Sequence, residues 1–138
     1  MANSTPARYM VTSALPYANG PIHVGHIAGA YLPADIYVRY LRARGRDVVW
    51  VCGSDEHGAA ITLRARKEGC SPSEIVDRYH AEMQAGFAGL GIDFDHYDRT
   101  SAQHHHAFAQ EFFKTLNDKG TFEVETRQQY FDEQEKQF

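Results

Sequence analysis

The sequence predicts an α/β fold in which a parallel sheet carries flanking helices. Two short apolar runs, over residues 8–15 and 47–53, are typical of buried strands. Between them, residues 26–44 have apolar side chains at helical spacing. A strand, a helix and a second strand in this order form the crossover unit of a parallel sheet, which fixes the fold class.

Each of these first elements has its own local signals. The strand over 8–15 is rich in β-forming side chains and ends at a loop with prolines and glycines. The helix over 26–44 ends at Gly45, and Pro33 inside it predicts a kink or a delayed helix start. The run over 47–53 is apolar throughout, which favours a central strand covered on both faces.

The rest of the chain predicts helices and weaker strands. In order, a helix, a second helix, a weak strand, a third helix and an extended β segment are expected over residues 59–68, 71–90, 92–97, 101–119 and 122–131. Ser71-Pro72-Ser73-Glu74 is a capping box, and Ser101 is expected to cap the third helix. About two convincing parallel strands are too few for a doubly wound sheet of about five, so we expect part of a domain.

Composition excludes several classes of protein. The 138 residues are 43% hydrophobic and 23% charged, as in an ordinary globular chain, and the net charge of −4 argues against binding nucleic acid mainly by unspecific phosphate neutralisation. Cys52 lies in an apolar run, and its spacing from Cys70 fits no CxxC motif, so a reducing, cytoplasmic environment is expected. Neither a signal peptide nor a membrane-spanning run is present in the sequence, so we expect no membrane partner.

The turn after the first strand has an unusual composition. Residues 14–26 read ALPYANGPIHVGH. In an open parallel sheet, ligands lie beyond the carboxyl ends of the strands, where a helix start offers backbone N–H groups. Gly25 would let a flat group such as a purine approach, while His23 and His26 can point toward one anion. Because no serine or cysteine pairs with them here, the histidines predict charge stabilisation at a phosphate.

Other readings of these side chains stay open. His23 and His26 could be surface residues of a shaped loop, and a zinc site is disfavoured because further ligands at suitable spacing are missing. Asp55 follows the second strand and would face the same crevice, although it could instead cap the next helix. The three histidines at 104–106 predict a solvated helix face and no metal, because consecutive helical side chains point about 100° apart.

Two motifs in the sequence resemble a known family. His23-Val24-Gly25-His26 resembles the HIGH signature of class I aminoacyl-tRNA synthetases, and the similarity extends over residues 12–39 in the form found in the methionyl enzymes. The stretch Gly53-Ser54-Asp55-Glu56-His57-Gly58 is similar to the GTDEHG element of the same enzymes, with serine in place of threonine. The chain therefore resembles the amino-terminal half of a Rossmann-like class I catalytic domain.

The resemblance implies an activity and a division of roles. The parent protein would be a methionine–tRNA ligase that activates L-methionine with ATP to methionyl-adenylate and transfers it to tRNA(Met). It implies that His23 and His26 are catalytic and contact the ATP phosphates, with Gly25 beside the adenine. The residues that it assigns to methionine are Ala14, Leu15, Tyr17 and Asp55.

Several other motifs of the family have no counterpart in residues 1–138. A KMSKS-like lysine loop, the cysteines of the zinc-bearing connective insertion and an anticodon-binding domain have no counterpart in the sequence. We therefore expect residues 1–138 to form a single unit that ends near the start of that insertion. ATP with Mg²⁺ would be used, and the zinc of the parent would be held by residues outside this chain. The oligomeric state is not fixed by the sequence. Two alternatives stay open: another adenylyl transferase with paired histidines, and a non-catalytic nucleotide-binding fragment.

Overall fold

The computed structural model describes residues 8–134. The elements are β1 (Arg8–Thr12), α1 (Val24–His26), the π-helix η1 (Ile27–Tyr31), α2 (Leu32–Ala43), β2 (Asp47–Ser54), α3 (Ala59–Glu68), α4 (Pro72–Gly89), β3 (His96–Arg99) and α5 (Gln103–Asp118). This alternation confirms the predicted α/β class. The chain divides into two compact units, Met1–His106 and Ala107–Phe138, and the sheet lies in the first. None of the described helices is long and apolar enough to cross a membrane.

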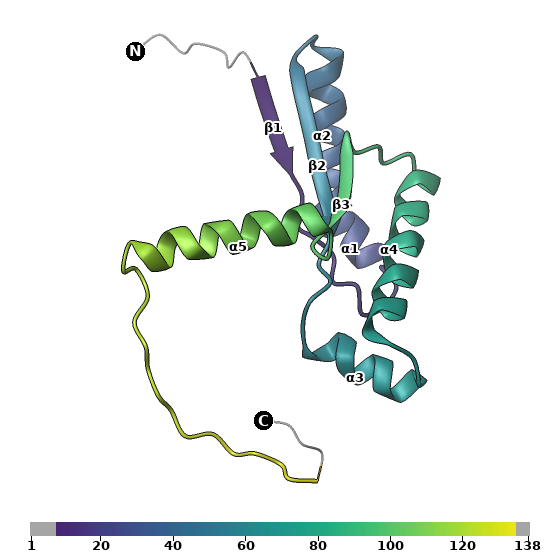
Figure 1. Ribbon diagram of the computed structural model, residues 1–138. Coiled ribbons are helices and arrows are strands. Elements are labelled where there is room, and N and C mark those ends of the chain that lie inside the picture. The colour runs from purple at the N-terminus through teal and green to yellow at the C-terminus, as the bar shows by residue number, and fades with distance from the viewer. Residues whose placement is uncertain (1–7, 135–138) are drawn as a thin grey trace. The chain divides into compact units, whose positions relative to one another are not determined.

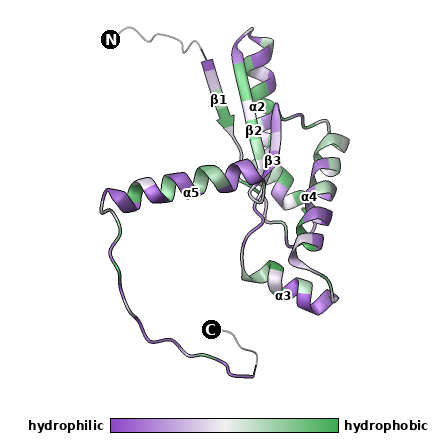
Figure 2. Cartoon of the chain, in the orientation of Figure 1, coloured by the Kyte–Doolittle hydropathy of each residue, from purple (hydrophilic) through white to green (hydrophobic). Residues whose placement is uncertain are grey.

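The sheet in the described residues has three parallel strands in the order β1-β2-β3. Arg8 lies opposite Asp47, and Val51 lies opposite His96. All three strands run in the same direction, so their carboxyl ends meet at one edge (Figure 1). β2 is the central strand, and Figure 2 shows that most of it is hydrophobic. Its Trp50 side chain is completely buried.

The first strand is shorter and more exposed than its apolar run predicts. It ends at Thr12, and Met10 is 72% exposed because no described element covers its face of the sheet. The prediction that the second strand is covered on both faces is also wrong in part. Val49 lies opposite Met10 and is 44% exposed. This face of the sheet is therefore bare at β1 and the first half of β2 in residues 8–134.

Pro33 shapes the helix that follows the loop. The chain passes from α1 through the π-helix η1 and continues as α2, with Pro33 in the first turn of α2. Proline has no N–H group to donate, so its place at a helix start removes no hydrogen bond. Because the chain is already helical from Val24, the alternative of a delayed start is wrong, and a π-helix, η1, lies directly before α2 instead. Gly45, with φ of +67°, follows the helix end in the left-handed conformation that the predicted stop requires.

The core of the first unit is formed by the sheet, α2, α3 and α4. The predicted capping box opens α4: the Ser71 hydroxyl accepts from the Glu74 N–H at 3.3 Å, and the Glu74 carboxylate accepts from the Ser71 N–H at 2.7 Å. The largest completely buried side chains are Trp50, Phe87, Ile61, Ile75, Met83 and Val38. Cys52 is buried and has a free thiol, as predicted.

Three predictions for the last third of the chain are wrong. Ser101 does not cap α5, because the helix begins at Gln103 and the residue just before it is Ala102; the Ser101 hydroxyl instead donates to the Glu56 carboxylate. The weak strand is displaced toward the carboxyl end, to His96–Arg99, while Ile92 is part of the core. Residues 122–131 form no strand in the described part of the chain, and Val124 is fully exposed. Among residues 8–134, no described strand pairs with residues 122–130, and β-forming side chains need such a neighbour to pack against.

Candidate active site

The loop after β1 and the end of β2 lie side by side at the carboxyl edge of the sheet. The Asp55 N–H donates to the Pro16 carbonyl, and the Ala18 N–H donates to the Asp55 carbonyl, both at 2.8 Å. These two bonds form a parallel bridge between Tyr17 and Asp55. The structure thus brings together, on adjacent backbones, two residues whose sequence positions are 38 apart.

The Asp55 carboxylate is free to bind a ligand. Its side chain is half-buried, and no hydrogen bond or ion pair joins it to another residue in the described part of the chain. The cap of α3 is Gly58, so the alternative that Asp55 caps this helix is excluded. Gly58 has φ of +140°, and a Cβ atom there would collide with the Tyr17 hydroxyl. Gly58 therefore makes room for the Tyr17 ring beside Asp55.

The two histidines of the loop form a reciprocal capping box at the start of α1. His23 Nδ1 accepts from the Gly25 N–H at 3.1 Å, and His26 Nδ1 accepts from the His23 N–H at 3.2 Å. The ring centroids are 3.9 Å apart. Because both Nδ1 atoms accept, a neutral ring carries its proton on Nε2. Both rings are exposed, which leaves two Nε2–H donors available to a ligand.

The structure explains why position 25 is a glycine, which the sequence alone did not. A Cβ atom at this position would lie 2.9 Å from Cε1 and 3.0 Å from Nδ1 of His23. The absence of a side chain at Gly25 therefore lets the His23 ring fold back onto the helix start. This steric role of Gly25 does not depend on whether a purine approaches the same backbone.

Of the predicted site residues, only Leu15 lines a cavity at the strand ends. Leu15, Cys52 and Gly53 line a cavity of about 180 Å³, together with residues that follow β3. Ala14 is exposed, and its carbonyl accepts from the Tyr31 hydroxyl at 3.0 Å. Tyr17, Asp55, His23 and His26 do not line this cavity. A larger depression of about 550 Å³ lies over α3 and also contains none of the predicted residues.

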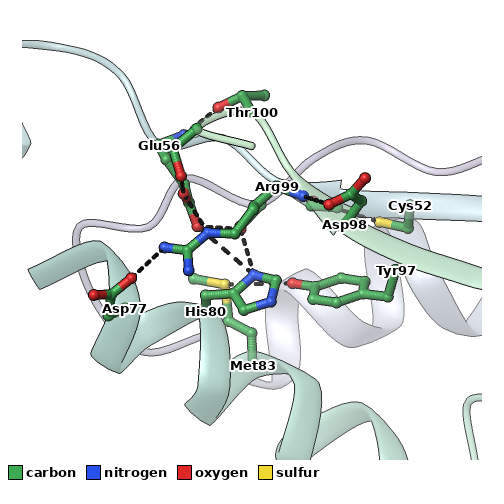
Figure 3. Close-up of polar contacts among 12 residues, drawn as sticks. Cys52, Glu56, Asp77, His80, Met83, Tyr97, Asp98, Arg99 and Thr100 are labelled. Atoms are coloured by element: carbon green, nitrogen blue, oxygen red, sulfur yellow. Dashed lines mark hydrogen bonds and ion pairs between the residues drawn. The ribbon is translucent and has the colours of Figure 1, made fainter. Parts of the chain in front are cut away.

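A buried acidic residue that sequence reasoning missed lies next to Asp55. The Glu56 side chain is completely buried, and its Oε2 accepts from Arg99 Nε at 2.8 Å and from the Ser101 hydroxyl. Its Oε1 accepts from the Ser54 hydroxyl at 2.6 Å. Figure 3 shows the Glu56 carboxylate directed at the Arg99 side chain. Arg99 also forms a 2.7 Å ion pair with Asp77 of α4. A glutamate two residues after β2 was the local signal, and its arginine is 43 residues away.

The titratable groups beside this network are held in their neutral forms. Burial, followed by the positive charge of Arg99, lowers the pKa of His80 below its ordinary value. His80 Nδ1 lies 2.7 Å from the Ser54 hydroxyl. Burial also raises the pKa of the Cys52 thiol to about 11, so Cys52 is not a thiolate nucleophile at neutral pH. Among the described residues, no group of three or more histidine, cysteine or acidic side chains could hold a metal ion.

Comparison with known proteins now identifies the family. Residues 9–138 match the family model described as tRNA synthetases class I (M). The chain belongs to this synthetase family. It is 59% identical over 131 residues to a methionine–tRNA ligase of Porphyromonas gingivalis strain W83, covering 95% of this chain and 19% of the relative. It is 56% identical over 133 residues to that of Flavobacterium johnsoniae, covering 96% and 19%. The synthetase chain thus spans about a fifth of the length of the curated relatives it matches.

Solved structures support the same fold assignment. A Mycobacterium tuberculosis methionyl-tRNA synthetase in complex with methionyl-adenylate aligns with a TM-score of 0.79 at 30% identity, covering 83% of this chain and 22% of that one. A leucyl enzyme in a ternary complex, Agrobacterium radiobacter K84 agnB2 LeuRS-tRNA-LeuAMS, aligns with a TM-score of 0.77 at 28% identity, covering 85% and 15%. The predicted Rossmann-like class I fold is confirmed by these alignments.

Proposed function

We propose that this chain is the amino-terminal half of the catalytic domain of a methionine–tRNA ligase, ending near the start of the connective insertion. Relatives of that name, at 56% and 59% identity, support the assignment. The observation that carries it is the backbone bridge between Tyr17 and Asp55 at the strand ends, where the Asp55 carboxylate has no partner among the described residues. Such a ligase activates L-methionine with ATP and transfers it to tRNA(Met), and the cytoplasm is the compartment that we propose for it.

Asp55 would bind the α-ammonium group of methionine. A half-buried carboxylate with no partner among the described residues can form a charge-assisted hydrogen bond with this cation. Tyr17, Leu15 and Ala14 precede it on the neighbouring backbone and would surround the methionine side chain. The Tyr17 ring is kept beside Asp55 because Gly58 makes room for it, so the aromatic face and the carboxylate would bind one amino acid together.

His23 and His26 would stabilise charge at the ATP phosphates. Adenylate formation joins a carboxylate oxygen of methionine to the α-phosphorus and breaks the bond from that phosphorus to the bridging oxygen of pyrophosphate, which leaves. The substrate carboxylate is the nucleophile, so no covalent enzyme intermediate is needed. The two Nε2–H donors would stabilise the negative charge that develops on the phosphate oxygens, and Gly25 would keep the His23 ring in place.

Mg²⁺ and zinc would differ in whether they need ligands from this chain. Mg²⁺ retains several waters and is commonly bound through substrate phosphates, so it would enter with ATP and need no cage of protein carboxylates. Zinc needs about four nitrogen or sulfur ligands, and among residues 8–134 no suitable cluster exists. The described residues therefore do not fit a zinc site, and we propose that the zinc ligands of the ligase lie elsewhere.

Amino-acid-dependent exchange between ATP and pyrophosphate tests this function. The full-length protein is assayed with methionine, leucine and several other amino acids, leucine being included because a leucyl enzyme shares the fold. We expect exchange with methionine and at least about a hundredfold lower kcat/KM with leucine. Exchange that depends on no amino acid would favour another adenylyl transferase, and ATP binding without exchange would favour a nucleotide-binding fragment. Either result would refute the proposal.

A further inference from the structure

The backbone that carries Asp55 is fixed from two sides. On one side, the loop after β1 holds the peptide groups of Asp55 itself, as described above. On the other side, the Thr100 N–H donates to the Ser54 carbonyl at 3.1 Å, and the Glu56 N–H donates to Thr100 Oγ1 at 2.8 Å. Residues immediately before and after Asp55 are thus both bonded to Thr100, just beyond the end of β3. The orientation of the Asp55 carboxylate depends on this arrangement.

The Glu56 carboxylate anchors the arrangement in the protein interior. Its two oxygens accept from Ser54, Arg99 and Ser101, and its side chain is completely buried. A buried carboxylate is stable when it is paired and its lone pairs accept hydrogen bonds, and both conditions are met here. Breaking the pair would leave the Arg99 guanidinium without its buried counter-charge. Ser101, just beyond β3, would then lose its bond to the segment at Asp55.

Arg99 extends the anchor to α4. Its second ion pair is with Asp77, and one turn further along α4 the His80 ring reaches the Ser54 hydroxyl (Figure 3). With Nδ1–H of His80 donating to the Ser54 hydroxyl and that hydroxyl donating to Glu56, Ser54 links α4 to the buried carboxylate. These bonds therefore join the end of β2, the end of β3 and α4 at the residue that follows Asp55.

We propose that Glu56 and Arg99 are positioning residues for amino-acid activation, which set the Asp55 carboxylate against Tyr17 without touching the substrate. This inference rests on the proposed function. The capping box of His23 and His26 has its own bonds and shares none with Glu56 or Arg99. Loss of the ion pair should therefore impair the use of methionine much more than the use of ATP.

The test compares Glu56→Gln with Glu68→Gln in the full-length protein. Glu68 is a matched control because it is also a carboxylate paired with arginine, in its case Arg64 and Arg78, but at the surface of α3. In the exchange assay we expect E56Q to raise the KM for methionine about tenfold or more, since small misplacements of a binding group have effects of this size. The KM for ATP should stay within about twofold, and E68Q should change neither value.

A second variant keeps the inference testable if E56Q does not fold. Ser101→Ala removes one donor to Glu56 and leaves the ion pair, so we expect a smaller increase, about threefold, in the KM for methionine alone. Unchanged methionine KM in both variants, or equal increases for methionine and ATP, would overturn the positioning role while leaving the proposed function intact. An unmodified protein without methionine-dependent exchange would instead refute the proposed function and this inference with it.

Discussion

Replacing Gly25 by alanine tests whether the His23 ring must fold back onto the start of α1. A Cβ atom at Gly25 would lie 2.9 Å from His23 Cε1, whereas ordinary contacts begin near 3.4 Å, so the ring must retreat by about half an ångström. The cap bond from the Gly25 N–H to His23 Nδ1 is then lost, which costs about 1 kcal/mol. Alanine recovers up to about 1 kcal/mol through its higher helix propensity, so the free energy of unfolding should hardly change.

We expect Gly25→Ala to lower the exchange activity although it hardly changes the stability. A shift of this size in a group that binds a phosphate predicts a loss of about tenfold or more in kcat/KM for ATP in the exchange assay. Gly29→Ala is the control, because Gly29 lies one turn further along and nothing lies within 4 Å of a Cβ atom there. If G25A and G29A have equal exchange rates, the His23 ring does not need to fold back onto the start of α1 for activity, and this explanation of Gly25 is wrong.

Three further predictions concern the core and its titration. Trp50→Phe removes the 2.9 Å bond from Trp50 Nε1 to the buried Ser13 hydroxyl and should lower the free energy of unfolding by about 1 to 3 kcal/mol in urea titrations. Ser71→Ala removes the cap of α4 and should cost about 1 kcal/mol by thermal unfolding, with no change in the KM for methionine. Because the folded pKa of His80 lies below its unfolded value of 6.5, the folded state binds fewer protons, and stability should be lost as the pH falls below about 6.5. His80→Gln should flatten this dependence in melts between about pH 7 and pH 5.

Local signals in the sequence predicted much of the fold. The capping box at Ser71 and the glycine stop at Gly45 depend on residues within one helical turn, so their sequence patterns determine the structure directly. The place of Asp55 beside the loop was also predictable, because the carboxyl ends of adjacent parallel strands meet at one edge. The cap role of His23 was not predicted, because histidine is not among the usual capping residues.

Features that depend on residues far apart in the sequence could not be predicted from local patterns. The pairing of Glu56 with Arg99 joins the ends of two strands, and neither residue has a local pattern that indicates its partner. The exposure of Met10 depends on what packs over that face of the sheet, which its apolar run cannot tell. The β-forming pattern over 122–131 failed for the same reason, since β structure needs a neighbouring strand to pair with.

The central claim is that paired histidines at the end of the first strand act on the phosphates of ATP during methionine activation. It is tested most directly by methionine-dependent exchange of ATP and pyrophosphate in the full-length protein and in its His23→Ala, His26→Ala double variant. Removing one preorganised donor typically costs a hundredfold or more in rate, so we predict that the double variant loses at least about a hundredfold in kcat while its thermal stability stays close to that of the unmodified protein. Exchange at the unmodified rate in the double variant would show that His23 and His26 do not act on the phosphates of ATP.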